Sequence, residues 1–62
     1  MLDANFLKGY IGGIISATDS PVKAFELCNN VLELAVQFDC KVEDVKSARS
    51  YCEYLISLLY GD

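Results

Sequence analysis

The side chains in this sequence with the widest range of possible chemistry are those of three cysteines, Cys28, Cys40 and Cys52. Thiolates bind zinc and act as nucleophiles, but zinc sites combine four ligands at short, characteristic spacings. Here successive cysteines are 12 residues apart, and the sequence contains no histidine. We therefore expect no metal and no cofactor. Cys28 and Cys52 are interpreted as small apolar core residues, as buried thiols usually are.

Catalysis lacks its usual groups. Without histidine, acid–base chemistry falls to carboxylates, which are spread along polar positions. Gly9, Gly12 and Gly13 follow no expected strand and precede no Lys-Ser/Thr pair, so they do not form a phosphate-binding loop. A chain of 62 residues also has little room for a pocket of about 300 Å³. We predict that the protein is not an enzyme and has no catalytic residue.

Arg49 is the charged residue with the most informative position. It projects near the centre of an apolar stripe in the last expected helix, about one turn from Val45 and Cys52. One interpretation is an interface anchor that reaches Glu26 or Glu33 of a second copy, since arginine is enriched at binding hot spots. The other is an ordinary arginine whose stem lies along the core edge and whose head reaches water.

Tyrosines supply the other candidate contact residues. Tyr54 lies on an outward helix face that is otherwise rich in serine, and Tyr60 ends the same helix. Tyrosine offers a large contact area at low entropy cost, although single exposed aromatics also occur without any function. Together with Tyr10 and Arg49, these are the residues we predict to contact a partner.

The charge of the chain limits its partners. The net charge is −4, the pI is about 4.4, and the five basic residues are scattered. Binding to nucleic acid requires a clustered basic face, so we expect no direct nucleic-acid contact. No stretch is apolar enough to span a membrane, and no signal peptide is recognised. We expect a cytoplasmic protein with reduced thiols, of a kind common in phage and mobile-element genomes.

The apolar spacing predicts a single all-α domain over residues 1–62, with helices at about 3–17, 21–38 and 42–60. Asp3 and Ser20 are the expected N-caps, Pro21 suits a first helical position, and Gly61 suits the end of the last helix. The last two helices form a hairpin. The inner stripe of the third contains Val45, Ala48, Cys52, Leu55, Ile56 and Leu59.

The first helix is the least secure of the three, because Gly9, Gly12 and Gly13 each cost about 1 kcal/mol in a helix interior. Three interpretations remain open: a surface that allows close approach of another helix, a kinked or broken helix, or association with a membrane surface.

The helix over 21–38 carries an apolar arc of roughly 200°, twice the width that a surface helix needs. Flanking helices, a second copy or a partner must cover it. We predict a helical-bundle homodimer, in which the contact residues are Leu27, Val31, Leu34 and Phe38.

These observations favour a non-catalytic interaction module that acts as an inhibitor, antagonist or adaptor of a larger cellular protein. It would mask its target through an aromatic-centred helix face with an acidic rim. The alternative is a structural subunit that assembles only with itself. A third possibility is a regulator that meets nucleic acid only within a complex.

Overall fold

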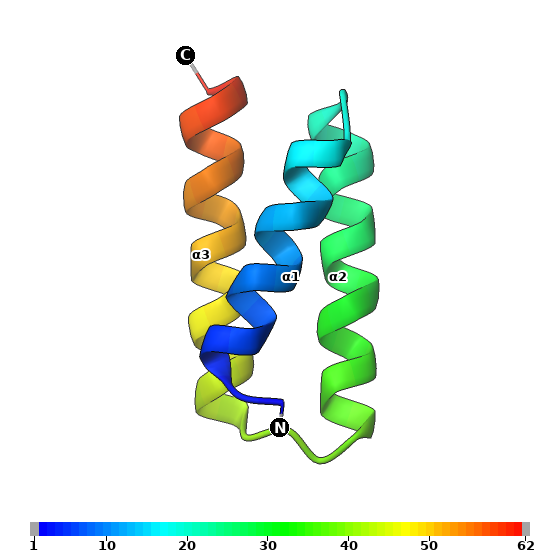
Figure 1. The fold of residues 1–62 in the computed structure, drawn as a ribbon, viewed down its shortest axis with the longest axis vertical. Helices are drawn as coiled ribbons and strands as arrows, with labels where there is room; N and C mark the ends of the chain where they lie inside the picture. The colour runs from blue at the N-terminus through cyan, green and yellow to red at the C-terminus, as the bar shows by residue number, and fades with distance from the viewer. Residues whose placement is uncertain (1, 62) are drawn as a thin grey trace.

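The computed structural model describes residues 2–61, which form a bundle of three α-helices (Figure 1). They are α1 (Ala4–Ala17), α2 (Pro21–Gln37) and α3 (Val42–Tyr60). Consecutive helices run in opposite directions, and α3 packs closely against both of the others. The bundle measures 34 × 15 × 14 Å. The predicted all-α fold is confirmed, with helix bounds within one residue of those expected.

Local hydrogen bonds explain where the first two helices begin. The Asp3 carboxylate accepts a hydrogen bond from the backbone N–H of Phe6 at 2.9 Å. The Ser20 hydroxyl accepts one from Lys23 N–H at 3.4 Å, and Pro21 follows at the first helical position. Each cap satisfies a donor that the helix leaves free. Both predicted N-caps are therefore confirmed.

The end of α2 is fixed by a Schellman motif. The N–H of Cys40 donates to the carbonyl of Ala35 at 3.0 Å, and that of Asp39 donates to Val36 at 3.1 Å. Asp39 has φ of 61°, the left-handed conformation that this motif requires. Aspartate tolerates that conformation better than most residues. The tight turn sends α3 back antiparallel to α2.

The core is a single cluster of small and aliphatic side chains in which the residues described include no buried polar side chain. All three helices contribute to it. Its members are Leu7, Ile11, Ile15, Ala24, Cys28, Leu32, Ala35, Val45, Ala48 and Cys52.

Leu59 does not belong to the core. Its spacing predicts a place on the inner stripe of the third helix, but its side chain is 59% exposed. The reason is length, because α3 has 19 residues against 14 in α1. The C-terminal turn of α3 therefore projects past the end of α1 (Figure 1). Leu55 and Ile56, one turn earlier, are packed against the core.

The glycines do not break α1, which is continuous from Ala4 to Ala17. They also do not mark a close contact within the bundle. A methyl group added at Gly9, Gly12 or Gly13 would meet no atom within 4 Å outside the local helix. Of the three interpretations, the broken helix is wrong. Within residues 2–61, no helix is long and apolar enough to cross a membrane.

The apolar arc of α2 is only partly covered by the other two helices. Its centre is buried, but both margins face solvent. The width of the arc predicts cover on two sides, yet α1 and α3 leave the margins of the arc exposed. The exposed margins are Val22, Phe25 and Val36 on one side, and Leu27, Leu34 and Phe38 on the other.

Candidate interaction surfaces

The two cysteines of the core lie where a thiol has low reactivity. Cys28 is fully buried and Cys52 is only 3% exposed. Burial, followed by a hydrogen bond and charge interaction with Cys52, raises the pKa of the Cys28 thiol from 9.0 to about 12. A thiol that stays protonated at neutral pH and does not meet solvent is a poor nucleophile and a poor metal ligand. Among residues 2–61, no cluster of three or more His, Cys, Asp or Glu could hold a metal ion.

Cys40 has a structural contact of a different kind. Its thiol donates a hydrogen bond to the carbonyl oxygen of Leu2 at 3.0 Å. This contact ties the segment before α1 to the connection between α2 and α3.

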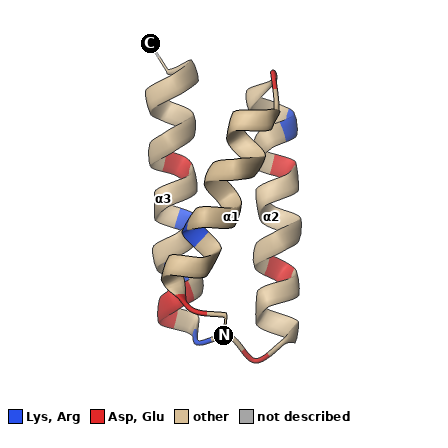
Figure 2. Ribbon diagram, viewed as in Figure 1, with Lys and Arg blue, Asp and Glu red and all other residues tan. Residues whose placement is uncertain are grey.

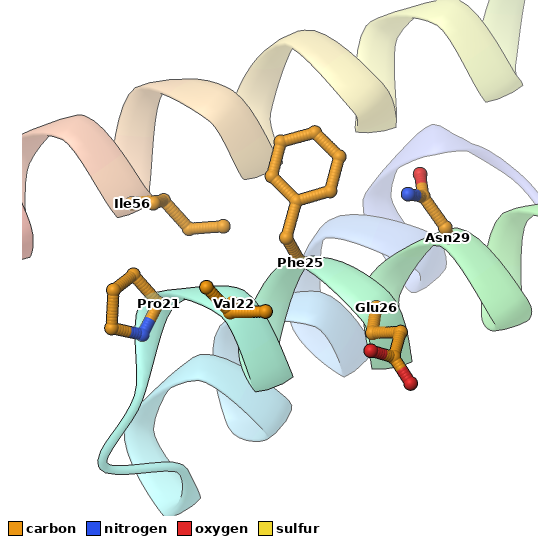
Figure 3. Close-up of a pocket in the computed structure, with 6 residues that line it drawn as sticks. All are labelled: Pro21, Val22, Phe25, Glu26, Asn29 and Ile56. Carbon is orange, nitrogen blue, oxygen red and sulfur yellow. The ribbon is translucent and has the colours of Figure 1, made fainter.

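A shallow hollow of about 440 Å³ lies between α2 and α3. We call it the α2–α3 hollow. In Figure 3 the ring of Phe25 and the amide of Asn29 rise from α2 toward α3, whereas the carboxylate of Glu26 points away. The Phe25 side chain is 37% exposed. The hollow is lined by Pro21, Val22, Phe25, Glu26, Asn29 and Ile56.

Arg49 lies beside this hollow and bonds to one of the residues that line it. Its guanidinium donates a hydrogen bond to the side-chain oxygen of Asn29 at 2.9 Å, and the residue is exposed. Arg49 thus lies at the edge of α3 that faces α2, not at the centre of the buried stripe. Its partner within the chain is an amide and not a carboxylate. This arrangement agrees with an arginine at the core edge, and its positive charge remains available to a partner.

Two carboxylates flank the hollow. Glu26 contributes to its lining from α2, and its carboxylate lies on the outer side, turned away from α3. Glu53 lies four residues after Arg49 and three before Ile56, so helical spacing puts it on the same side of α3. Both side chains are exposed, and acidic positions on both helices are visible in Figure 2. The hollow is therefore apolar at its centre and charged at its margins, with the guanidinium of Arg49 beside Asn29 and carboxylates on both helices.

The tyrosines predicted to contact a partner do not form one site. Tyr60 is 37% exposed, and its hydroxyl donates to the carbonyl of Thr18 at 2.9 Å, which joins the end of α3 to the end of α1. Tyr54 is 61% exposed, lies on α3 and does not line the α2–α3 hollow. Tyr10, at 55% exposure, belongs to a second surface on α1.

That second surface, the α1–α2 face, is an apolar groove of about 210 Å³ between the two helices. Phe6 and Tyr10 stack one turn apart, with ring centroids 6.4 Å from each other. Three of the four predicted self-association residues lie here, and Leu27 is exposed one turn from Val31 on the same helix. The groove is lined by Leu2, Phe6, Leu7, Tyr10, Val31, Leu34, Ala35 and Phe38.

Sequence reasoning missed Phe6, Val22 and Phe25 as surface residues. Phe6 shares a helical stripe with Leu7 and Ile11, so periodicity alone placed it among the core residues. The arc of α2 did carry a signal. Because the arc is twice the width that packing needs, its two margins were the positions to expect at the surface.

Comparison of the chain with protein-family models, with curated protein sequences and with solved structures gave no significant match.

Proposed function

We propose that this protein is a non-catalytic interaction module that inhibits, antagonises or adapts a larger protein, and that the α2–α3 hollow is its contact surface. The observation that carries the proposal is the position of Phe25. Its ring lies partly exposed in an apolar hollow between two helices, beside the 73% exposed side chain of Val22. Exposed apolar clusters rimmed by polar residues are typical of protein contact sites.

The chemistry of the hollow indicates what it would bind. The apolar centre suits one aliphatic or aromatic side chain of a partner. The carboxylates of Glu26 and Glu53 suit lysine or arginine beside that side chain, and the net charge of −4 would steer the chain toward a basic surface. Binding would inhibit the partner by covering part of its surface, which requires no catalytic step.

We also propose that the protein acts in the cytoplasm. Its three cysteines are free thiols, and thiols persist in a reducing compartment. Cys28 and Cys52 then serve packing, and Cys40 serves the contact with Leu2.

The proposal can be tested with a photo-reactive phenylalanine analogue at position 22, in the full chain and in its native host cell. Val22 is exposed, so the substitution leaves the core intact. The same analogue at Ser47, exposed on α3, is the control. We expect position 22 to crosslink to a larger protein and position 47 to give no such product. Equal crosslinking from both positions, or none from position 22, would overturn the proposal.

A substitution then tests whether the hollow contributes binding energy. Val22→Asp places a charge at the apolar centre, whereas Ser47→Asp adds the same charge elsewhere. We expect the first change to weaken capture by about 30-fold, equivalent to about 2 kcal/mol at a binding hot spot. The second should have no effect.

The alternative, a subunit that assembles with itself, is favoured by a different observation. The α1–α2 face is apolar and lies on the other margin of α2 from the hollow.

A further inference from the structure

The α1–α2 face is unusual for the surface of a charged protein, because α1 carries almost no charge. Lys8 is the only charged residue between Ala4 and Ala17, and its ammonium lies over the ring of Tyr51 on α3, 5.8 Å from the centroid. The ribbon of α1 in Figure 2 is otherwise free of charged positions. Surfaces of soluble domains normally mix charges of both signs. The solvent face of α1 thus has the composition of a contact surface.

From this face we infer that the protein forms a homodimer in which α1 packs antiparallel against α1 of a second copy. The inference concerns a surface separate from the α2–α3 hollow and does not depend on the function proposed for it.

The distribution of side-chain sizes along α1 supports a second copy as the occupant. On the solvent side of α1, the large exposed residues Phe6 and Tyr10 lie in the N-terminal half, and the small exposed residues Gly13 and Ala17 lie in the C-terminal half. Gly13 and Ala17 line a shallow hollow beside Tyr10. In an isologous contact, residue i of one copy meets residue j of the other, and residue j meets residue i in turn. An antiparallel pair centred between Ile11 and Gly12 therefore sets large residues against small ones.

The register of this pairing is specific. Phe6 of one copy would face Ala17 of the other, and Tyr10 would face Gly13. Each of these pairs joins a larger side chain to a glycine or an alanine. Because a methyl group at Gly13 would have open space around it in the single chain, that space is available to Tyr10 of the second copy. Gly13, which costs helix stability, then gains a role that the monomer does not give it.

Charge argues for the same occupant. The chain has a net charge of −4, so two copies repel one another overall. The α1–α2 face is the part that can approach its equivalent without opposing like charges. An acidic or basic partner would find no complementary charge here. Leu27, Leu34 and Phe38 on the neighbouring margin of α2 extend the apolar contact on both copies.

The test uses two variants that complement each other only in this register. Tyr10→Lys places an unpaired ammonium against Gly13 of the second copy, and Gly13→Glu places an unpaired carboxylate against Tyr10. Both positions are exposed in the single chain, so each variant should retain its helicity by circular dichroism. Ser47→Lys and Ser50→Glu, exposed on α3, are matched charge controls.

Sedimentation equilibrium of the full chain under reducing conditions gives the readout. We expect the original chain and both controls to dimerise, and each α1 variant to dimerise more than about a hundredfold more weakly, because a buried charge is unpaired. An equimolar mixture of the two variants should recover a dimer, since the ammonium introduced at position 10 of one chain then meets the carboxylate introduced at position 13 of the other.

Three results would overturn the inference: a chain that stays monomeric to millimolar concentration, variants that dimerise like the controls, or a mixture that does not recover. None of these results bears on crosslinking from position 22. Failure of the dimer and failure of the hollow are therefore separable.

Discussion

At the residue scale, Cys28 makes the folding stability depend on pH in the alkaline range. The thiol ionises near pH 9.0 when unfolded and near 12 when folded, so above pH 9 the unfolded chain binds fewer protons. The free energy of unfolding should fall as pH rises between these values, by up to about 1.4 kcal/mol per pH unit. Urea unfolding at pH 8 and pH 10 tests this, with Cys28→Ala as reference. The stability advantage of the original chain over this variant should shrink at pH 10, and a constant difference would contradict the prediction.

Arg49 and Leu59 show what single residues reveal before a structure is known. Their spacing placed both on the inner stripe of the last helix, and that helix forms with the predicted bounds. The burial of a side chain, however, also depends on how far its helix extends beside the neighbouring helices and on how each helix is rotated about its own axis. Arg49 lies at the margin that faces α2, where it bonds to Asn29. Helix periodicity does not contain this tertiary information. The buried positions of Cys28 and Cys52, near the middle of their helices, were predictable.

At the element scale, the connection between α2 and α3 is under mild backbone strain at Asp39, whose φ is 61°. Glycine adopts this conformation without a steric cost. Asp39→Gly should therefore raise the free energy of unfolding by about 0.5–1 kcal/mol, and Asp39→Ala should lower it by about 1 kcal/mol. Thermal unfolding would show shifts of several degrees in opposite directions. Asp19→Gly is the control, because Asp19 has no positive φ, and it should not stabilise the chain.

Helix α1 separates the stability of the fold from self-association. Gly12→Ala and Gly13→Ala each add a methyl group with no atom within 4 Å, so both should stabilise the monomer by about 1 kcal/mol. Gly13 lies in the proposed contact. Gly12 lies outside it, on the flank of α1 that also carries Lys8 and is turned toward α3. We expect Gly13→Ala alone to weaken the dimer, as measured by sedimentation equilibrium on chains of equal helicity. Equal dimerisation by the two variants would argue against close packing at Gly13.

At the scale of the whole molecule, the fold was more predictable than the surfaces. Capping by Asp3 and Ser20, the proline at position 21 and the apolar spacing are local signals, and they fixed three helices. The surfaces arise from pairs of helices. Phe6 and Phe38 line the same groove on the α1–α2 face. Phe25 of α2 and Ile56 of α3 line the same hollow. Spacing within one helix does not determine such pairs, so the predicted tyrosines were divided between unrelated positions.

Added salt should strengthen dimerisation through the α1–α2 face and weaken partner binding at the α2–α3 hollow. Two copies, each with a net charge of −4, repel one another while they meet through an uncharged face. Raising the salt concentration from 0.1 M to 1 M shortens the screening length from about 10 Å to about 3 Å, so dimerisation should strengthen. A partner held beside Glu26 and Glu53 by its basic residues should bind more weakly, because the same screening removes attraction. Sedimentation equilibrium measures the first change, and the crosslinking yield from position 22 measures the second. A dimer that weakens with salt would mean that charged groups hold the two copies together and would exclude the uncharged α1 contact.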